Sequence, residues 1–504
     1  MRRVPTSVRE PAAPERETTA AAWLALGAIV ALAAALRFAT LDTQSVWFDE
    51  AATWDLVRGS FGQMLHGVAH GESTPPLFYA LEWVWTRAFG DGEAGLRSLP
   101  ALVGLLTVPV AYAIGRRAGR GRVAVGLAAA ALVAVNPLLV WYSQEARSYA
   151  LAVLLSALAL AFLMRAQDDR RQRVLAGWAL AATLALATHY FTAFALAPQA
   201  AWLLWRHPRR RAALAAVGAL AVAAAALLPL LLAQSGNPYD IAGTSLAVRL
   251  VQVPKQFLLG YRGPLALPLG VLGALLVLGA AWLLVRRTPR AARALLLAGI
   301  GVAGVALPLL TALVGEDYLN TRNVLPALIP LLTALAVGCA ASDRPRLGAG
   351  LLAALCAISL AIVVAVDADA GYQRPDWRGL ARALGAAGGP RALVVAPANG
   401  ELALRYYRPA IGTMGAAGTA VREVDVIAVA GSRDPGAAPR IPPLVGTALA
   451  APGFGAPQRS ATSTYELLRF RAVGAAPVPV SPNPLGAVRF GQAPPSVDVL
   501  PAGR

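Results

Sequence analysis

Residues 20–38 read AAAWLALGAIVALAAALRF, an apolar run with one charged residue, Arg37. At about 1.5 Å per residue, a helix of this run has nearly the length of the roughly 30 Å hydrocarbon core of a bilayer. Similar runs follow along the chain. The sequence therefore predicts an α-helical polytopic membrane protein with about eleven spans, at 20–38, 98–115, 123–140, 148–164, 174–188, 190–205, 212–233, 265–285, 293–314, 323–341 and 347–366.

Composition agrees with that pattern. Of 504 residues, 57% are hydrophobic and 14% are charged, against about 25% charged in soluble proteins. The net charge is +18, and its arginines gather in short segments between the apolar runs, at 116–122, 165–173, 206–211, 286–293 and 344–346. Such loops mark the cytoplasmic side of a membrane protein. We therefore expect a multi-pass plasma-membrane protein with a cytoplasmic tail at 1–19 and no nucleic-acid partner.

One apolar stretch, 76–89, tests this topology. It is short for a span and contains Glu82 and Arg87. Counting it as a span would place every later arginine segment outside the cell. The sequence therefore predicts an amphipathic interface helix at 76–89, within a first outer loop at 39–97.

The composition changes after Val366. A short helix at 376–384 and β-rich runs at 392–396, 424–430 and 465–470, separated by Gly and Pro, predict a small exoplasmic α/β domain at 372–474. The remainder, 475–504, is rich in Pro, Gly and Ala, which is typical of a flexible tail.

Two adjacent carboxylates stand out in the first outer loop, in Trp47-Phe48-Asp49-Glu50-Ala51. Carboxylates beside apolar surface lose solvation, so one of them could act as a base or a ligand. A solvated loop with an aromatic belt would give the same pattern. These residues alone do not separate the two interpretations.

Other outer segments add cations and polar aromatics. Arg147 follows Tyr142 and Glu145 in WYSQEARSY at 141–149, and at an outer surface it needs a partner: Glu145, Glu50 or a phosphate. Further polar residues predicted at this face are His70, His189, Tyr190, Lys255 and Arg322. Together they predict a site for an anionic, lipid-borne substrate.

Several segments, taken in order, resemble a known family. They are WFDEA at 47–51, TPPLFY at 74–79, NPLLVWYSQEARSYAL at 136–151, THYFTAF at 188–194, RNVLPALIPLL at 322–332 and DWRGLARAL at 376–384. This series is similar to the bacterial branch of glycosyltransferase family 39. That branch belongs to the GT-C superfamily, with the protein O-mannosyltransferases and the lipid A aminoarabinose transferase as relatives. The resemblance covers about residues 20–366.

The resemblance implies a membrane glycosyltransferase of GT-C type. Such an enzyme takes a sugar, here expected to be mannose, from a polyprenyl-phosphate carrier at the outer leaflet of the membrane lipids. It passes the sugar, usually with inversion, to a hydroxyl of an exported protein, a glycan or a glycolipid. Asp49 corresponds to the general base, and Glu50 would orient it or contact the acceptor.

By family position Arg147 would bind the donor phosphate, and the predicted topology adds His189, Lys255 and Arg322 to it. The residues expected to contact the acceptor or shape the site are Trp47, His70, Tyr142, Glu145 and Tyr190. The chain has Ser73-Thr74-Pro75-Pro76 where bacterial relatives have a His before the prolines.

No cofactor is required by this pattern. Distant relatives, the oligosaccharyltransferases, hold a divalent metal ion with acidic residues of the first two outer loops. Asp49 and Glu145 occupy analogous loops, so a metal site there stays open.

Two alternatives remain beside mannosyl transfer. The first is transfer of arabinose or another pentose onto envelope glycan or lipid. The second is a transporter or flippase of lipid-linked sugars, which would be expected to place ionisable residues at mid-membrane and often to show internal repeats. The spans are nearly free of charge at their centres and show no repeat, which favours an enzyme at the interface.

Overall fold

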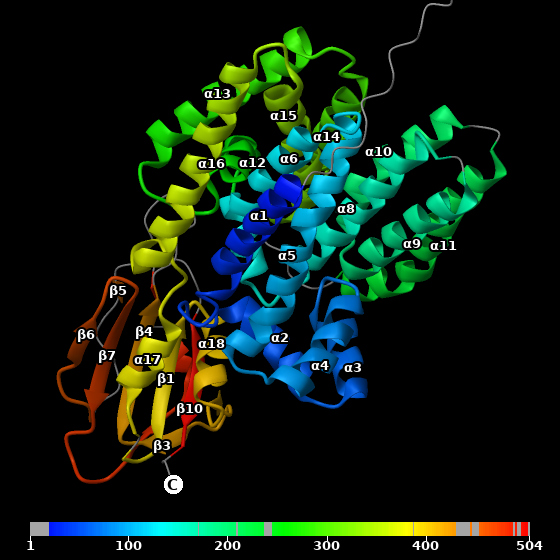
Figure 1. The fold of residues 1–504 in the computed structure, drawn as a ribbon. Coiled ribbons are helices and arrows are strands. Elements are labelled where there is room, and N and C mark those ends of the chain that lie inside the picture. Colours follow the sequence, from blue (N-terminus) through cyan, green and yellow to red (C-terminus); the bar gives the residue numbers. More distant parts are fainter. Residues whose placement is uncertain are drawn as a thin grey trace, which may run out of the picture.

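The computed structural model describes residues 20–169, 171–207, 210–235, 244–386, 388–429, 444–445, 453–486, 489–490 and 495–501. The predicted tail at 1–19 lies outside them. A bundle of long helices has a small sheet domain at one end (Figure 1). The predicted fold class, a polytopic helical protein with a small α/β domain, is confirmed.

The helices of the bundle follow the predicted spans closely. They are α1 (Ala20–Phe38), α5 (Glu93–Ala118), α6 (Val123–Val135), α7 (Pro137–Ser143), α8 (Tyr149–Ala166), α9 (Gln172–Thr188), α10 (Thr192–Arg206), α11 (Arg211–Gln234), α13 (Ala266–Arg287), α14 (Ala292–Leu313), α15 (Leu328–Ala341) and α16 (Pro345–Ala368), with the 3₁₀ helix η1 (Thr321–Ala327) leading into α15.

Among the described residues, eight helices are long and apolar enough to cross a membrane, or nine if the bent pair α6 and α7 forms one span. The two other predicted spans are α9 and α10, which have 17 and 15 residues. The total of eleven therefore stays a prediction.

The predicted span at 123–140 is broken, with a 60° bend between α6 and α7. Pro137 has no N–H to donate, and Asn136 caps α7 by accepting from the backbone N–H groups of Leu138 and Leu139 at 3.1 Å each. The carbonyls of Val133 and Ala134 thus lose their usual helical donors.

The guanidinium of Arg37 replaces those donors. Its Nη1 donates to the Ala134 carbonyl at 2.8 Å, and its Nη2 donates to the Val133 carbonyl at 3.2 Å. Arg37 is fully buried, and buried polar groups need such partners. The one charge of the first apolar run therefore stabilises a break in a neighbouring helix.

The segment 39–97, predicted as the first outer loop, forms three short helices, α2 (Phe48–Arg58), α3 (Phe61–Gly71) and α4 (Leu77–Phe89). Arg97, near the start of α5, donates to the carbonyls of Leu41 and Gln44 at 2.7 and 2.6 Å. Since Leu41 and Gln44 directly follow α1, that helix ends where α5 begins. The two ends of the segment 39–97 therefore lie at the same end of the bundle. The placement of 76–89 in the membrane interface stays a prediction.

Helix α4 is the predicted helix at 76–89. The guanidinium of its Arg87 lies 4.0 Å from the centre of the Trp83 ring and donates to the Gly59 carbonyl at 2.6 Å. Arg87 therefore connects α4 to the end of α2. A further helix, α12 (Leu246–Leu259), lies in the loop 234–264, where the sequence predicted no helix. Ser245 caps it.

The sheet domain follows α16. Its six-stranded sheet has the order β2-β10-β1-β4-β7-β6, in which β1 and β4 are parallel and the other pairs are antiparallel. Its elements are η2 (Ala370–Tyr372), α17 (Trp377–Leu384), β1 (Arg391–Ala396), α18 (Gly400–Tyr407), β2 (Gly412–Thr413), β3 (Thr419–Val421), β4 (Glu423–Val429), β5 (Leu444–Val445), β6 (Gln458–Ala461), β7 (Tyr465–Arg471), β8 (Val478–Val480), α19 (Pro482–Gly486), β9 (Arg489–Phe490) and β10 (Ser496–Leu500).

The prediction of a flexible tail at 475–504 is wrong for its last strand. Strand β10 lies between β1 and β2, with Arg391 opposite Leu500 and Val395 opposite Ser496. The sequence SVDVL alternates apolar and polar residues, as a strand does. The prediction of a flexible tail used the composition of 475–504 as a whole and therefore missed this short pattern. The domain therefore extends to Leu500.

Deleting residues 496–504 should unfold the sheet domain, because it removes an interior strand. We expect digestion of this domain by protease in detergent to be roughly tenfold faster or more. Deleting 502–504 alone is the control and should leave digestion unchanged, since the last paired residue is Leu500. Equal protection of the two truncated chains would contradict the role of β10.

Candidate active site

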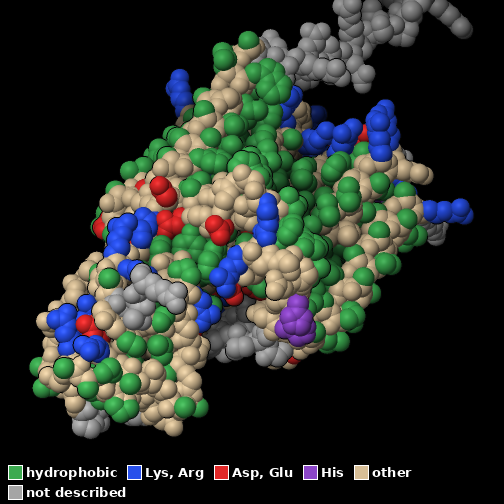
Figure 2. All heavy atoms as spheres, turned by 90° about the horizontal axis from the view of Figure 1, so that it is seen from below, with side chains coloured by type: hydrophobic (Ala, Val, Ile, Leu, Met, Phe, Trp, Pro, Cys, Tyr) green, Lys and Arg blue, Asp and Glu red, His purple; other side chains and the backbone are tan. Residues whose placement is uncertain are grey.

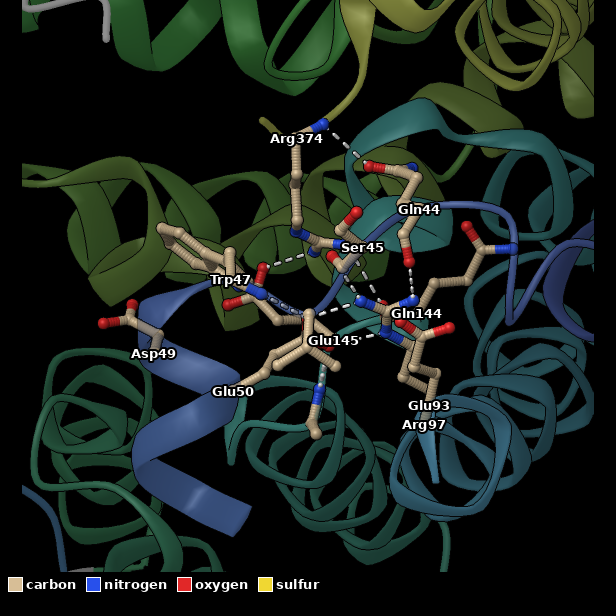
Figure 3. Close-up of polar contacts among 12 residues, drawn as sticks. Gln44, Ser45, Trp47, Asp49, Glu50, Glu93, Arg97, Gln144, Glu145 and Arg374 are labelled. Atoms are coloured by element: carbon tan, nitrogen blue, oxygen red, sulfur yellow. Dashed lines mark hydrogen bonds and ion pairs between the residues drawn. The ribbon is translucent and has the colours of Figure 1, made fainter. Parts of the chain in front are cut away.

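A buried ion pair fixes the start of α2. Glu50 is fully buried, and Arg97 donates to it twice, from Nε to Oε1 at 2.7 Å and from Nη2 to Oε2 at 2.6 Å (Figure 3). The backbone N–H of Ala146 also donates to Oε1, at 3.1 Å. Burial by itself would raise the pKa of Glu50, but the charges of Arg97 and Arg374 and these hydrogen bonds hold it below its ordinary value.

Asp49 has a different environment. Figure 3 shows its carboxylate pointing away from the network that holds Glu50. Its side chain is 16% exposed, and the Nη1 of Arg322 lies 3.4 Å from its Oδ2. Two adjacent carboxylates are thus separated into a buried anchor and an accessible group. Contact between Glu50 and an acceptor does not fit this burial, whereas the other expected role, orienting Asp49, does.

Arg147 lies beside Asp49 but pairs with a residue that the sequence interpretation did not consider. Its Nη1 and Nη2 donate to the two carboxylate oxygens of Glu72 at 2.8 and 3.0 Å. Nη1 also lies 3.4 Å from the backbone carbonyl of Asp49. The predicted partners Glu145 and Glu50 are therefore wrong. Glu72 follows α3, and no local pattern connects it to Arg147.

His189, in the turn between α9 and α10, is buried and accepts a hydrogen bond at Nδ1 from the Phe191 N–H at 3.3 Å. Burial lowers its pKa to about 3, helped by the charges of Arg322 and Arg147. The imidazole is therefore neutral at physiological pH, with its proton on Nε2. His189, which the predicted topology adds to the donor-phosphate site, lies near both arginines as a neutral imidazole. The adjacent Tyr190 donates its hydroxyl to Gln234 at 2.9 Å.

The second buried pair joins the bundle to the sheet domain. Arg374, just before α17, donates from Nη2 to Oε2 of Glu145 at 2.8 Å, and both side chains are almost fully buried. Its guanidinium lies 4.5 Å from the centre of the Trp141 ring and 5.7 Å from that of Trp47. Burial raises the pKa of Glu145 to about 7, against the opposing charge of Arg374.

Helices α17 and α18 of the sheet domain also contact the first outer loop. The Val46 N–H donates to the Tyr407 hydroxyl at 2.7 Å, and the Tyr406 ring packs edge-on against Trp54 at 5.2 Å. Arg378 forms an ion pair with Glu93 at the start of α5. Figure 2 views the molecule from this end and shows basic and acidic side chains close together where domain and bundle meet. The domain thus helps to hold α2 in place.

The other predicted site residues divide into two groups. Trp47 precedes α2 beside Arg374, and the buried Tyr142 ring packs edge-on against Tyr149 at 4.9 Å. His70 is exposed on α3 and bonds to the His66 carbonyl at 2.8 Å. Lys255 lies half-buried on α12. Within the described residues, neither His70 nor Lys255 contacts Asp49, so the structure does not bring these two side chains together with Asp49, Arg147 and Arg322.

Sequence reasoning missed Arg97, Arg374 and Glu72. Arg97 carried a usable signal, because an arginine at the outer end of a span goes against the positive-inside rule and calls for a partner. Arg374 and Glu72 gave no such signal, since their partners are far away in the sequence.

The described residues do not provide the metal site left open by the sequence. No three His, Cys, Asp or Glu side chains among them come together in a way that could hold an ion. Glu145 is bonded to Arg374, and Asp49 is paired with Arg322. This donor set does not fit a metal ion.

Residues 73–233 match the family model described as dolichyl-phosphate-mannose-protein mannosyltransferase. The match covers about a third of the chain and falls within the residues that carry the GT-C resemblance. This segment begins just after Glu72 and contains Arg147 and His189. No curated protein matches the chain.

Three solved structures are distantly similar. ArnT from Cupriavidus metallidurans bound to undecaprenyl phosphate is 17% identical over 67% of this chain and 63% of that one, with a TM-score of 0.47. The chain thus spans less than two thirds of that protein. The arabinosyltransferase EmbB from Mycobacterium smegmatis is 14% identical over 89% and 48%, with a TM-score of 0.44. The S. cerevisiae protein O-mannosyltransferase Pmt1-Pmt2 complex bound to the sugar donor is 20% identical over 43% and 33%, with a TM-score of 0.33.

Arg374→Ala should destabilise the protein by about 3–5 kcal/mol, because it leaves the Glu145 carboxylate buried without its partner. Thermal or chemical unfolding in detergent measures this. The control is Arg471→Ala, which breaks an ion pair with Glu423 in which Arg471 is 56% exposed and should cost less than about 1 kcal/mol.

The double variant Arg374→Ala, Glu145→Gln should recover part of the lost stability, since it removes the unpaired carboxylate. Equal losses for Arg374→Ala and Arg471→Ala would show that the buried pair does not stabilise the junction.

Proposed function

We propose that this chain transfers a sugar from a polyprenyl-phosphate carrier to a hydroxyl acceptor, with Asp49 as the general base. The observation that carries the proposal is that the two neighbouring carboxylates, Glu50 and Asp49, lie in different environments. Glu50 is buried, ionised and fixed by Arg97, and Asp49 is held at the accessible side of the same helical turn. A general base must reach the proton that it removes, and of the two carboxylates Asp49 can do so.

Cations near Asp49 support a phosphorylated donor. Arg322 lies 3.4 Å from the carboxylate of Asp49, and Arg147 lies 3.4 Å from its backbone carbonyl. A polyprenyl phosphate can leave without a general acid if its developing charge is stabilised, and guanidinium groups suit phosphate. In this proposal Arg322 and Arg147 bind the phosphate, and neutral His189 donates a hydrogen bond from Nε2.

The sugar proposed is mannose, because the matching family model is described by that sugar. The acceptor is proposed to be a hydroxyl of an exported protein, a glycan or a glycolipid. Incubation of the purified chain with a panel of mannose, arabinose and aminoarabinose carriers tests the choice of sugar. Consumption of a pentose carrier in preference to the mannose carrier would contradict it.

The orientation proposed places the site outside the cytoplasm. The segments that contain Arg116, Arg165 and Arg293 lie at the end of the bundle opposite Asp49, as the chain directions of α5, α8 and α14 require. Short Arg-rich loops face the cytoplasm, so Asp49 and the sheet domain would face the exterior. Helix α4 would then lie along the outer interface.

Asp49→Asn should reduce sugar transfer by about 10²–10⁴-fold, because the amide cannot accept the proton of the acceptor hydroxyl. Its unfolding temperature should stay unchanged, since the volume is nearly conserved. Asp55→Asn is the matched control on the same helix; Asp55 is 42% exposed and pairs with Arg58, and it should keep full activity. Activity of Asp49→Asn close to that of Asp55→Asn would remove Asp49 as the base.

Arg322→Gln should remove about 2–4 kcal/mol of transition-state stabilisation and lower kcat/KM for the donor accordingly. The fall should include a higher donor KM, measured in steady-state assays at saturating acceptor. Arg58→Gln, an exposed arginine on α2, is the control. If kcat falls while the donor KM stays constant, Arg322 orients Asp49 and does not bind the donor.

A further inference from the structure

A cavity lies at the end of the bundle opposite Asp49. It has a volume of about 720 Å³, and its walls come from α1, α5, the turn after α5, the residues after α8 and the start of α14. Helix α1 begins at this end and α5 finishes there, so the cavity is separated from the candidate active site by the length of both helices. Nothing in the proposed reaction uses it.

One part of this cavity is strongly basic. Arg116, Arg117, Arg120 and Arg293 line it together with one acidic residue, Asp168. Asp168 is already paired with Arg293, and nearby Asp169 is paired with Arg165. Within the part of the chain that the structure describes, no carboxylate lies within 4.0 Å of Arg116, Arg117 or Arg120. Three guanidinium groups therefore face the cavity in excess over acidic groups.

The other part of the cavity is apolar and faces outward from the bundle. Pro109 and Ala113 lie one helical turn apart on α5, and both are exposed. Trp23 of α1 is 58% exposed and forms the facing wall. At about 1.5 Å per residue, Pro109 lies about 10 Å below Arg116 along the helix. A surface of this kind, inside a membrane span, would lie against acyl chains.

A hydrated basic loop would explain the arginines at the end of α5. It would not explain the apolar groove that continues from them along α1 and α5. A ligand that fits both parts has a phosphate at one end and hydrocarbon at the other. Basic pockets between transmembrane helices on the cytoplasmic side are suited to anionic lipid head groups. Guanidinium groups pair with phosphate in a directional way.

We propose that this cavity binds one anionic phospholipid. Its phosphate lies among Arg116, Arg117 and Arg120, and an acyl chain runs over Ala113 and Pro109 beside Trp23. The inference does not depend on the proposed sugar transfer, because the two sites lie at opposite ends of the bundle.

The test is native mass spectrometry of the full chain purified in detergent and titrated with phosphatidylglycerol. Phosphatidylcholine with the same acyl chains is the neutral comparison, and inorganic phosphate is the competitor. We expect one phosphatidylglycerol to bind about tenfold or more tightly than phosphatidylcholine. Equimolar inorganic phosphate should not displace it, because it lacks the apolar contacts.

The charge variant is the triple substitution Arg116→Gln, Arg117→Gln, Arg120→Gln. It should weaken the binding of phosphatidylglycerol by about fivefold per arginine, on the order of 100-fold in all. Its matched control, Arg286→Gln, Arg287→Gln, Arg290→Gln, removes the same charge from the same end of the bundle outside the cavity lining, and should bind as the unmodified chain does.

A second pair of variants keeps all charges. Ala113→Trp fills the apolar groove and should also lower binding, whereas Leu214→Trp adds the same bulk on an exposed face of α11 and should not. The proposal is overturned if the cavity variants bind phosphatidylglycerol as tightly as their controls, if phosphatidylcholine binds equally well, or if equimolar inorganic phosphate displaces the lipid.

Discussion

The candidate site depends on one buried ion pair, Glu50 with Arg97. The guanidinium donates to both carboxylate oxygens and to the backbone carbonyls of Leu41, Gln44 and Ser45. These bonds connect the end of α1, the start of α2 and the start of α5. Removing one partner of a buried ion pair lowers the stability of the folded protein by about 3–5 kcal/mol, because the other charge stays buried without a partner. The first turn of α2 is therefore fixed, and Asp49 is fixed with it.

The sheet domain extends this arrangement. Arg374 enters from the chain that leads into α17 and pairs with Glu145, which directly precedes the Ala146 N–H that bonds to Glu50. Tyr406 and Tyr407 contact the same outer loop. The domain is therefore part of the support of the site, although its own sheet carries none of the predicted site residues. Loss of the domain would expose Glu145 and Trp47 together.

Charge is arranged differently at the two ends of the bundle. Around Asp49 nearly every arginine has a carboxylate partner: Glu50, Glu72, Asp49 and Glu145 each pair with a guanidinium. Around the cavity at the opposite end, three arginines lack a carboxylate partner among the described residues. Paired charges fix geometry, which suits catalysis, whereas unpaired cations beside an apolar groove suit an anionic amphiphile. Arginines thus pair with carboxylates at one end of the bundle, and among the described residues three of them line an apolar groove without such partners at the other.

The sequence by itself determined the helical membrane fold, most helix boundaries in the bundle and the presence of a small α/β domain, because hydropathy and periodicity are local properties of the chain. It also singled out Asp49, Glu50 and Arg147 from short motifs, and His189 and Arg322 from the predicted topology. Only the tertiary structure decided the partners: Arg97 for Glu50, Glu72 for Arg147 and Arg374 for Glu145. It also decided that His189 is neutral and that 496–500 is an interior strand. Pairing and desolvation depend on which distant segments meet, and that information is not contained in any local stretch of sequence.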